Sequence, residues 1–463
     1  MKGLLISLLL IGFAINIEAQ ESVNLTLDDC IKYALENNEQ LEIARLDNEI
    51  ARTQINETLA RGLPQVNGSV GLVKNFEIQT SFIQDFISPA VYGVLIDESL
   101  LPDGTQIPEP QTFPAAFETE YSGQAGLTAR QLIFDGSYFV GLKAAQTVKL
   151  LSQREQKQTE VQIVEGVSKA YYLVLITKEN LDFLGRNFGT IDTLLQETEA
   201  MYEVGFAEKI DVSRLKIQHN NIKTELKNNT ELLITSLNLL KFQMGMPLNQ
   251  RIALTDDLSN ISLTPVTEPG GEYHVNRPEY DVLQTNKDLI DLNIKNFQSQ
   301  YIPNIYANFN FGWTAGTNSF SRLTEFNDQT WFRYSNLGVT LSIPIFDGLS
   351  KRANIQRNRI QKQQVEESIS QFENNVDREV AEAKVKVDNA IRSVETQSEN
   401  VELAEEVYEM TKAKYQEGIG SNLEVIEANT SLKESKTNYL NALYEAATSQ
   451  IELKKALGTL YNN

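Results

Sequence analysis

The chain has 463 residues and a formal net charge of −21, because 62 Asp and Glu outnumber 41 Lys and Arg. This acidity argues against nucleic acid as a partner, since phosphate binding needs a basic surface. With 41% hydrophobic residues the chain can bury a core, but a mean hydropathy of −0.30 excludes a bundle of membrane helices.

The first residues predict an export signal. A single positive charge, Lys2, precedes a short apolar run, and the segment ends near Ala19. This pattern is typical of a cleaved signal peptide over residues 1–20, and the run is too short to span a membrane. Cys30 is the only cysteine. It lies beyond the expected cleavage point and inside a helical pattern, so we expect a buried thiol rather than a lipid anchor.

The next residues predict a first structural repeat over 21–248. Apolar residues at helical spacing, without proline, indicate long helices, and apolar residues that alternate with small polar ones indicate strands. The expected elements are strands at about 65–74 and 120–134, long helices at about 136–201 and 208–244, and a surface loop with at most a short helix at about 75–119.

An equatorial connector between repeats is expected over 249–276, where Pro265 and Pro269 interrupt regular structure and Ile261 to Leu263 could pair as a short strand. The same design then starts again over 277–463. Its expected elements are strands at about 304–315 and 331–346 and long helices at about 348–415 and 422–458.

Two repeated motifs indicate that the chain is a duplication. Tyr202 to Arg214 has the pattern of Tyr415 to Glu427, and Phe134-Asp-Gly recurs as Phe346-Asp-Gly. In both copies of the Tyr-x-x-Gly motif the glycines interrupt a long helical pattern, which predicts a turn between two helices. A continuous helix over 136–202 would extend for roughly 100 Å.

The strands fit either a soluble sandwich or an outer-membrane barrel. The export signal and the aromatic residues near strand ends, such as Trp313, Trp331 and Tyr121, favour the barrel. The smallest membrane barrels need about eight strands, whereas this chain offers four. Since open strand edges are not tolerated in lipid, we expect several copies to pool their strands in a homo-oligomer.

Together these features resemble the TolC family of outer-membrane efflux proteins. The resemblance extends from about Leu25 to Gly458 and rests on the opening Leu25-Thr-Leu-Asp-Asp, the duplicated Phe-Asp-Gly and Tyr-x-x-Gly motifs, and their order. It implies a mainly α fold with a transmembrane β-barrel portion, in which a homotrimer forms a twelve-stranded barrel in outer-membrane lipid. A long coiled-coil-like helical tunnel then crosses the periplasm towards a periplasmic adaptor (membrane fusion protein) and an RND-type or ABC-type inner-membrane pump.

The function that this resemblance implies is a passive exit duct for small molecules. Type I protein secretion remains open, because a duct does not choose its cargo. A periplasmic adaptor would lack the duplicated strand pairs. An enzyme is the remotest alternative: His219, His274 and Cys30 are far apart in sequence, so no metal site, cofactor or catalytic triad is expected.

An acidic pair follows the second turn. Glu424 and Glu427 are spaced i, i+3 and share a helix face. The ordinary interpretation is a solvated acidic face. By resemblance they line the periplasmic aperture, where three protomers would bring six carboxylates together. Crowded carboxylates are stabilised by cations, so such a ring would favour cations and be blocked by multivalent ones.

Asp211 and Tyr415 match positions that join helix pairs in the family's closed state. The alternative is that Asp211 caps a helix and that Tyr415 packs under the turn. Gly420 departs from the pattern, because it stands where the closed-state lock of a family member has an arginine. The turns at the tips, which the family also uses for adaptor docking, are expected at Tyr202, Gly205, Gly418 and Gly420.

Overall fold

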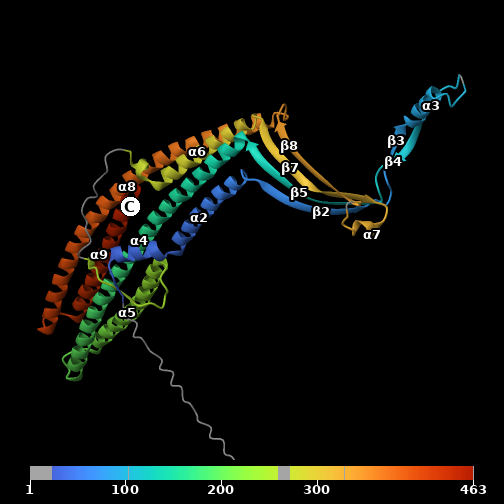
Figure 1. Ribbon diagram of the computed structural model, residues 1–463. Helices are drawn as coiled ribbons and strands as arrows, with labels where there is room; N and C mark the ends of the chain where they lie inside the picture. Colours follow the sequence, from blue (N-terminus) through green and yellow to red (C-terminus); the bar gives the residue numbers. More distant parts are fainter. Residues whose placement is uncertain (1–22, 103, 259–271, 328, 462–463) are drawn as a thin grey trace, which may run out of the picture. The chain divides into compact units, whose positions relative to one another are not determined.

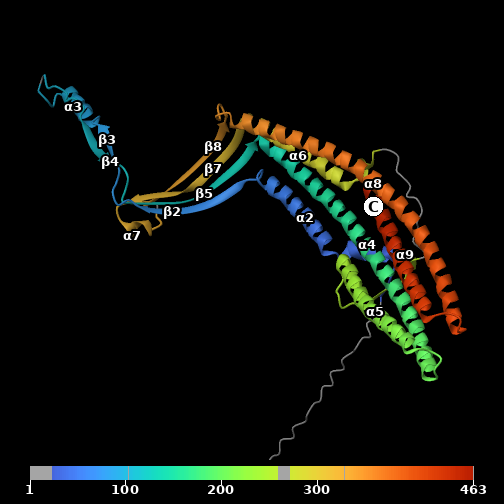
Figure 2. The same cartoon turned by 180° about the vertical axis from the view of Figure 1, so that it is seen from behind.

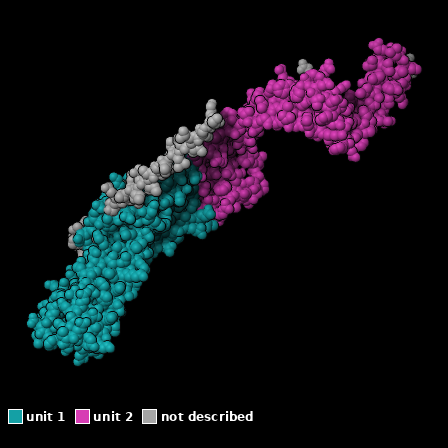
Figure 3. Space-filling model, turned by 90° about the horizontal axis from the view of Figure 1, so that it is seen from below, with its two compact units in different colours: residues 1–52, 147–290, 360–463 teal, residues 53–146, 291–359 magenta. Residues whose placement is uncertain are grey.

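The computed structural model describes residues 23–102, 104–258, 272–327 and 329–461, which form two compact units (Figure 3). Unit 1 comprises residues 1–52, 147–290 and 360–463, and unit 2 comprises residues 53–146 and 291–359. The expected signal peptide and the short strand proposed for Ile261 to Leu263 lie outside the described residues.

Unit 1 is mainly helical (Figure 1). Its own elements are β1 (Val23–Leu25), α1 (Leu27–Asn37), α5 (Lys209–Met244), β6 (Ile252–Leu254), the 3-10 helix η2 (Tyr273–Asn276) and α9 (Asn422–Ala456). Four helices contribute residues to both units, namely α2 (Glu39–Ala60), α4 (Gly136–Glu203), α6 (Pro278–Ser299) and α8 (Ser350–Gln416). No helix in the described part of the chain has both the length and the apolar character needed to cross a membrane.

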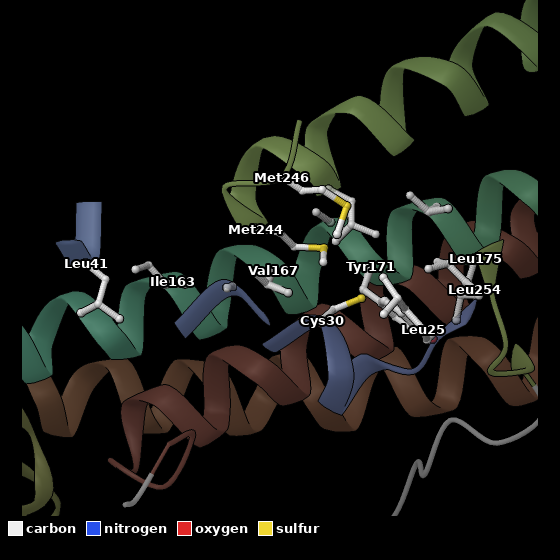
Figure 4. Packing of buried hydrophobic residues seen from close by; sticks show 14 residues of the cluster. Leu25, Cys30, Leu41, Ile163, Val167, Tyr171, Leu175, Met244, Met246 and Leu254 are labelled. Atoms are coloured by element: carbon white, nitrogen blue, oxygen red, sulfur yellow. The ribbon is translucent and has the colours of Figure 1, made fainter. Parts of the chain in front are cut away.

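Near the two short strands, α1 and α5 pack against α4 around a sealed core. Cys30, Tyr171 and Met244 converge there (Figure 4), and each of them is fully buried. Burial raises the pKa of the Cys30 thiol to about 12, so this cysteine is an inert core residue. The Tyr171 hydroxyl donates a hydrogen bond of 2.7 Å to Asp256, which satisfies a polar group that burial would otherwise penalise.

Strands β1 and β6 form a parallel pair that the sequence analysis did not anticipate. Val23 aligns with Ile252 and Leu25 with Leu254. Strands of three residues are too short to show an alternating pattern, so they cannot be predicted from sequence periodicity. This pair joins the beginning of the first repeat to the connector.

A network of ion pairs joins α4 to α9 within unit 1. Lys455 lies 2.7 Å from Glu165, and Lys169 lies 2.9 Å from Glu165 and 3.0 Å from Glu452. Burial by itself would raise the pKa of Glu165, but hydrogen bonds from Lys455 and Lys169 hold it below its ordinary value. The Glu165 carboxylate is therefore kept charged between the two helices.

Unit 2 holds a four-stranded antiparallel sheet in the order β2-β5-β7-β8, whose strands lie side by side in both views (Figures 1 and 2). Unit 2 also holds a two-stranded ribbon, β3 with β4, and two short helices. The elements are β2 (Gln65–Lys74), β3 (Thr80–Gln84), α3 (Ile87–Asp97), β4 (Thr112–Ala116), β5 (Tyr121–Phe134), β7 (Asn304–Thr317), α7 (Phe320–Leu323) and β8 (Trp331–Ser342).

The register separates the sheet's two faces. One row across the four strands pairs Val66, Ala129, Phe309 and Leu337, and the neighbouring row pairs Asn67, Thr128, Asn310 and Asn336. Successive side chains of a strand point to opposite faces, so these rows define an apolar face and a polar face. On the polar face Asn310 donates a hydrogen bond of 2.9 Å to Asn336.

Three details of unit 2 differ from the sequence-based expectations. Strand β8 ends at Ser342 rather than near Phe346, because Pro344 has no N–H to continue a ladder. The segment 75–119 contains the short helix that the sequence allowed, α3, but also the strands β3 and β4, which were not expected. Pro114 itself lies in β4 and pairs with Phe82, because each strand of a two-stranded ribbon has a free edge that tolerates proline.

The third difference concerns Trp331, which was expected among exposed aromatic residues at a membrane interface. Its side chain is only 5% exposed. Its ring lies where a Cβ at Gly123 would be 2.7 Å from the Trp331 Cη2 atom, and its indole N–H donates to the Leu323 carbonyl at 3.1 Å. The absence of a side chain at Gly123 makes room for the ring, and this is a tertiary effect that no local pattern reveals.

The left-handed glycines give a first prediction. Gly205 and Gly245 have φ values of +83° and +69°, so an alanine at either position is strained by about 1–2 kcal/mol. At Gly245 the added Cβ would also lie 2.5 Å from the Asn37 carbonyl oxygen, whereas at Gly205 it would meet open space. We expect Gly245→Ala to lower the free energy of unfolding by about 3 kcal/mol or more.

The matched control is Gly205→Ala, which we expect to lose only the backbone term. The stabilities of the two variants are compared by thermal unfolding of the full chain in detergent, followed by helical circular dichroism. Gly245→Ala should have the lower midpoint temperature. Equal midpoints would show that packing between α1 and the end of α5 does not restrict Gly245.

Candidate functional site

The two repeated turns close two helical hairpins with the same backbone motif. After α4, the Gly205 N–H bonds to the Tyr202 carbonyl at 3.1 Å and the Phe206 N–H to the Met201 carbonyl at 2.8 Å. After α8, Gly418 bonds to Tyr415 and Ile419 to Lys414, each at 3.0 Å. These are Schellman motifs, in which a glycine at the left-handed position ends the helix. The shared Tyr-x-x-Gly pattern is therefore a helix-ending signal.

Below the turns, one apolar core joins both hairpins. Leu194 of α4 and Leu215 of α5 pack in the same cluster as Val425 of α9 and Tyr408 of α8. Leu215 and Val425 are fully buried. The four helix ends therefore form a single structural element, which we call the tip.

Glu424 and Glu427 project from the tip on its exposed side. Glu424 lies in the first turn of α9, and its N–H bonds to the Ser421 hydroxyl that caps the helix, at 3.2 Å. A carboxylate near a helix N-terminus is stabilised by the helix dipole. Val425 and Ala428 lie beside the pair and are buried in the core, so the helix must present both glutamates away from the core.

The structure gives Asp211 and Tyr415 separate partners. Asp211 accepts a hydrogen bond of 3.3 Å from the Glu208 N–H in a reciprocal cap at the start of α5. The Tyr415 hydroxyl lies 2.8 Å from the Thr198 hydroxyl, which links the end of α8 to α4. Tyr415 thus ties the two hairpins together, whereas Asp211 stabilises its own helix.

Gly420 has a packing reason to be glycine. A Cβ at this position would lie 3.0 Å from the Tyr415 nitrogen and 3.1 Å from the Lys414 carbonyl carbon. Contacts this short with backbone atoms are unfavourable, so any residue with a Cβ, arginine included, would require the turn to shift by a few tenths of an ångström. The turn itself therefore disfavours the arginine that the resemblance would place here.

A buried cluster of amides in the tip was missed by the sequence analysis. Asn429 is fully buried; its side-chain amide donates to Asn187 at 2.7 Å, and its carbonyl accepts from Gln218 at 3.3 Å. Tyr408 is buried nearby, and desolvation raises its pKa to about 12. A polar residue in an apolar helical seam fixes the register between helices. Asn429 among apolar neighbours was the signal that could have revealed this cluster.

Within the described ranges, no group of three His, Cys, Asp or Glu residues is arranged to hold a metal ion. The site consists instead of two matched turns, an exposed acidic pair and a polar link between hairpins. Together with a sheet that has an apolar and a polar face, this arrangement fits a channel-forming membrane protein.

Comparison with known proteins agrees with this class. The family model of the outer membrane efflux protein matches residues 30–246 and 273–459, and the chain therefore belongs to that family of outer-membrane proteins. The outer membrane protein TolC of Vibrio cholerae is 20% identical over 73% of this chain and 76% of its own length. The probable efflux pump outer membrane protein TtgC of Pseudomonas putida is 21% identical over 75% and 71%.

The fold has a matching solved structure in the CmeC outer membrane channel of Campylobacter jejuni. The TM-score is 0.71 at 15% identity, over 94% of this chain and 86% of that chain. The expected fold, mainly helical with a small set of strands, is therefore confirmed.

The Tyr415 link gives a second prediction. Tyr415→Phe removes the hydrogen bond to Thr198 and should weaken the contact between hairpins by about 0.5–1.5 kcal/mol. Amide hydrogens in the last turn of α8 should then exchange about 2 to 12 times faster, as measured by mass spectrometry.

Tyr202→Phe is the matched control, because Tyr202 occupies the equivalent place in the first hairpin but is 45% exposed. It should leave exchange in α8 unchanged, whereas Thr198→Val should reproduce the effect of Tyr415→Phe. The same exchange rate in all three variants would exclude the link.

Proposed function

We propose that the chain is the outer-membrane exit duct of a tripartite efflux system, through which small molecules pass passively when it is docked to an adaptor and an inner-membrane pump. The observation that supports this proposal best is the four-stranded sheet. It has four strands with two free edges, β2 and β8, and large apolar side chains on one face. Leu337 is 74% exposed and Val66 is 63% exposed, which in a single chain would leave an apolar surface in water.

Closure of the sheet explains both features. Lipid covers the apolar face, and the free edges β2 and β8 pair between neighbouring copies, because open edges are not tolerated in a bilayer. Three copies give the twelve-stranded barrel that the resemblance implies, with the polar face lining the lumen. In a homotrimer of the family type, every strand then has a neighbour on both sides.

The tip supplies the periplasmic end of the duct. In a trimer, Glu424 and Glu427 from three copies form the acidic aperture ring, and the Tyr415 link holds neighbouring helix pairs in the resting state. Phe206 and Ile419 occupy the same place after the two turns and are 87% and 81% exposed. Exposed apolar side chains at matched positions support the proposal that the adaptor docks on these turns.

The barrel is tested by placing a charge on each face in turn. We expect Leu337→Lys, on the apolar face, to cost about 2–4 kcal/mol in lipid and to reduce the yield of trimers in outer-membrane fractions strongly. Its neighbour Asn336 points to the polar face, so Asn336→Lys should assemble normally and form conducting channels in planar bilayers.

The wild-type chain should appear as a trimer after chemical cross-linking and conduct ions. A soluble monomer, or equal tolerance of lysine at both positions, would contradict the duct.

The aperture ring gives a further prediction. Carboxylates from three copies attract multivalent cations, so a trivalent cation should block wild-type conductance at low concentration. We expect the double variant Glu424→Ala, Glu427→Ala to weaken this block by about tenfold or more, since each lost charge removes about 1 kcal/mol or more at short range.

Glu434→Ala serves as control, because Glu434 is exposed on the same helix about two turns further from the tip. Its block by the trivalent cation should equal that of the wild type. A double variant with unchanged block would place the cation-sensitive constriction elsewhere.

A further inference from the structure

The four strands of the sheet carry a charge pattern opposite to that of the chain. None of them contains Asp or Glu, although the chain has a net charge of −21. Their charged side chains are Lys74, Arg130 and Arg333. The register places Lys74 and Arg333 on the apolar face with Leu337, and Arg130 on the polar face with Asn310. Arg130 is thus the one charged strand residue that faces the side assigned to the lumen.

Arg130 is held in a defined position by the neighbouring strand. Its register partners are Gln65 on β2 and Asn308 on β7. The guanidinium carbon lies 4.0 Å above the centre of the Tyr306 ring, a close cation–π contact between diagonal neighbours. A cation–π contact does not use the guanidinium N–H groups as hydrogen-bond donors to an oxygen, so these groups remain available to a ligand.

A hollow of about 430 Å³ surrounds this pair within unit 2. Its lining includes Arg130, Tyr306 and Gln65, together with Arg61 and Glu57. Arg61 and Glu57 are 3.2 Å apart and neutralise one another. No carboxylate in the described part of the chain forms an ion pair with Arg130. The hollow therefore has a net positive charge that comes from Arg130.

We propose that Arg130 and Tyr306 form an anion-binding subsite in the lumen, which takes the carboxylate, phosphate or sulfonate group of small organic anions. An arginine edge binds such groups through two parallel N–H bonds, a geometry that a lysine does not offer. Tyr306 holds the guanidinium in place, whereas the side-chain amide of Gln65 beside it already donates to the Ala60 and Leu63 carbonyls. The inference rests on the proposed duct, in which three copies place three such subsites around one passage.

With this subsite, the passage has two charged sites of opposite sign. The aperture ring attracts cations through Glu424 and Glu427, and the sheet attracts anions through Arg130. Walls of low dielectric strengthen the field of each group of charges. Anionic cargo would then be concentrated at the barrel, and its passage would depend on Arg130 without any change in the aperture.

The test uses citrate as the probe on single wild-type trimers in a planar bilayer. Citrate on the barrel side should reduce the current in a concentration-dependent way. In Arg130→Gln the half-blocking concentration should rise by about fivefold or more, as expected for the loss of one short-range charge per copy. Arg130→Lys keeps the charge but not the paired N–H geometry. Its half-blocking citrate concentration should therefore lie between those of the wild type and Arg130→Gln.

Arg333→Gln is the matched control, because it removes the same charge from the other face of the same sheet. Its citrate block should equal that of the wild type, and Tyr306→Leu should weaken the block as Arg130→Gln does. A trimer yield in outer-membrane fractions equal to that of the wild type shows that each variant is folded.

The outcomes separate the two proposals. A wild-type chain that forms no conducting trimers would overturn the duct and the subsite together. Conducting trimers that citrate does not block, or whose block is the same in Arg130→Gln as in the wild type, would overturn the subsite alone.

Discussion

The rest of the structure depends on the backbone hydrogen bonds that the four-stranded sheet leaves unmade. Strands β2 and β8 each have one free edge, and in lipid every N–H and C=O group must find a partner within protein. In the proposed duct, that requirement makes the sheet part of a larger barrel. Closure of that barrel makes the polar face its lumen, so that each residue on this face is repeated around the passage once per copy.

The duplication reuses backbone signals but not side-chain chemistry. Both hairpins end in the same Schellman motif, with glycine at Gly205 and Gly418. The surroundings then diverge: the Tyr415 hydroxyl reaches Thr198, whereas Tyr202 is 45% exposed. A duplicated hairpin can therefore keep its shape while one copy acquires the contacts that hold the pair together.

The sequence allowed prediction of those features that repeat over many residues. Long helices and the strands of the main sheet follow from spacing alone, because each extends over ten residues or more. The β1–β6 pair, the ribbon of β3 with β4 and the burial of Trp331 did not follow. Strands β1 and β6 are too short to show a period, and the ribbon of β3 with β4 contains Pro114. The burial of Trp331 depends on the absent side chain at Gly123, two strands away.

The same distinction applies to the candidate site. The sequence was sufficient to place Glu424 and Glu427 on one exposed helix face, but not to choose partners for Tyr415 or to find the Asn429 cluster. Arg130 shows why: in the sequence it is an ordinary arginine in an acidic protein, and only the register shows that no other charged strand residue shares its face. Charge composition describes a whole chain, whereas a passage responds to the few charges that its lining exposes. An acidic protein can therefore present a cationic lining where its cargo leaves.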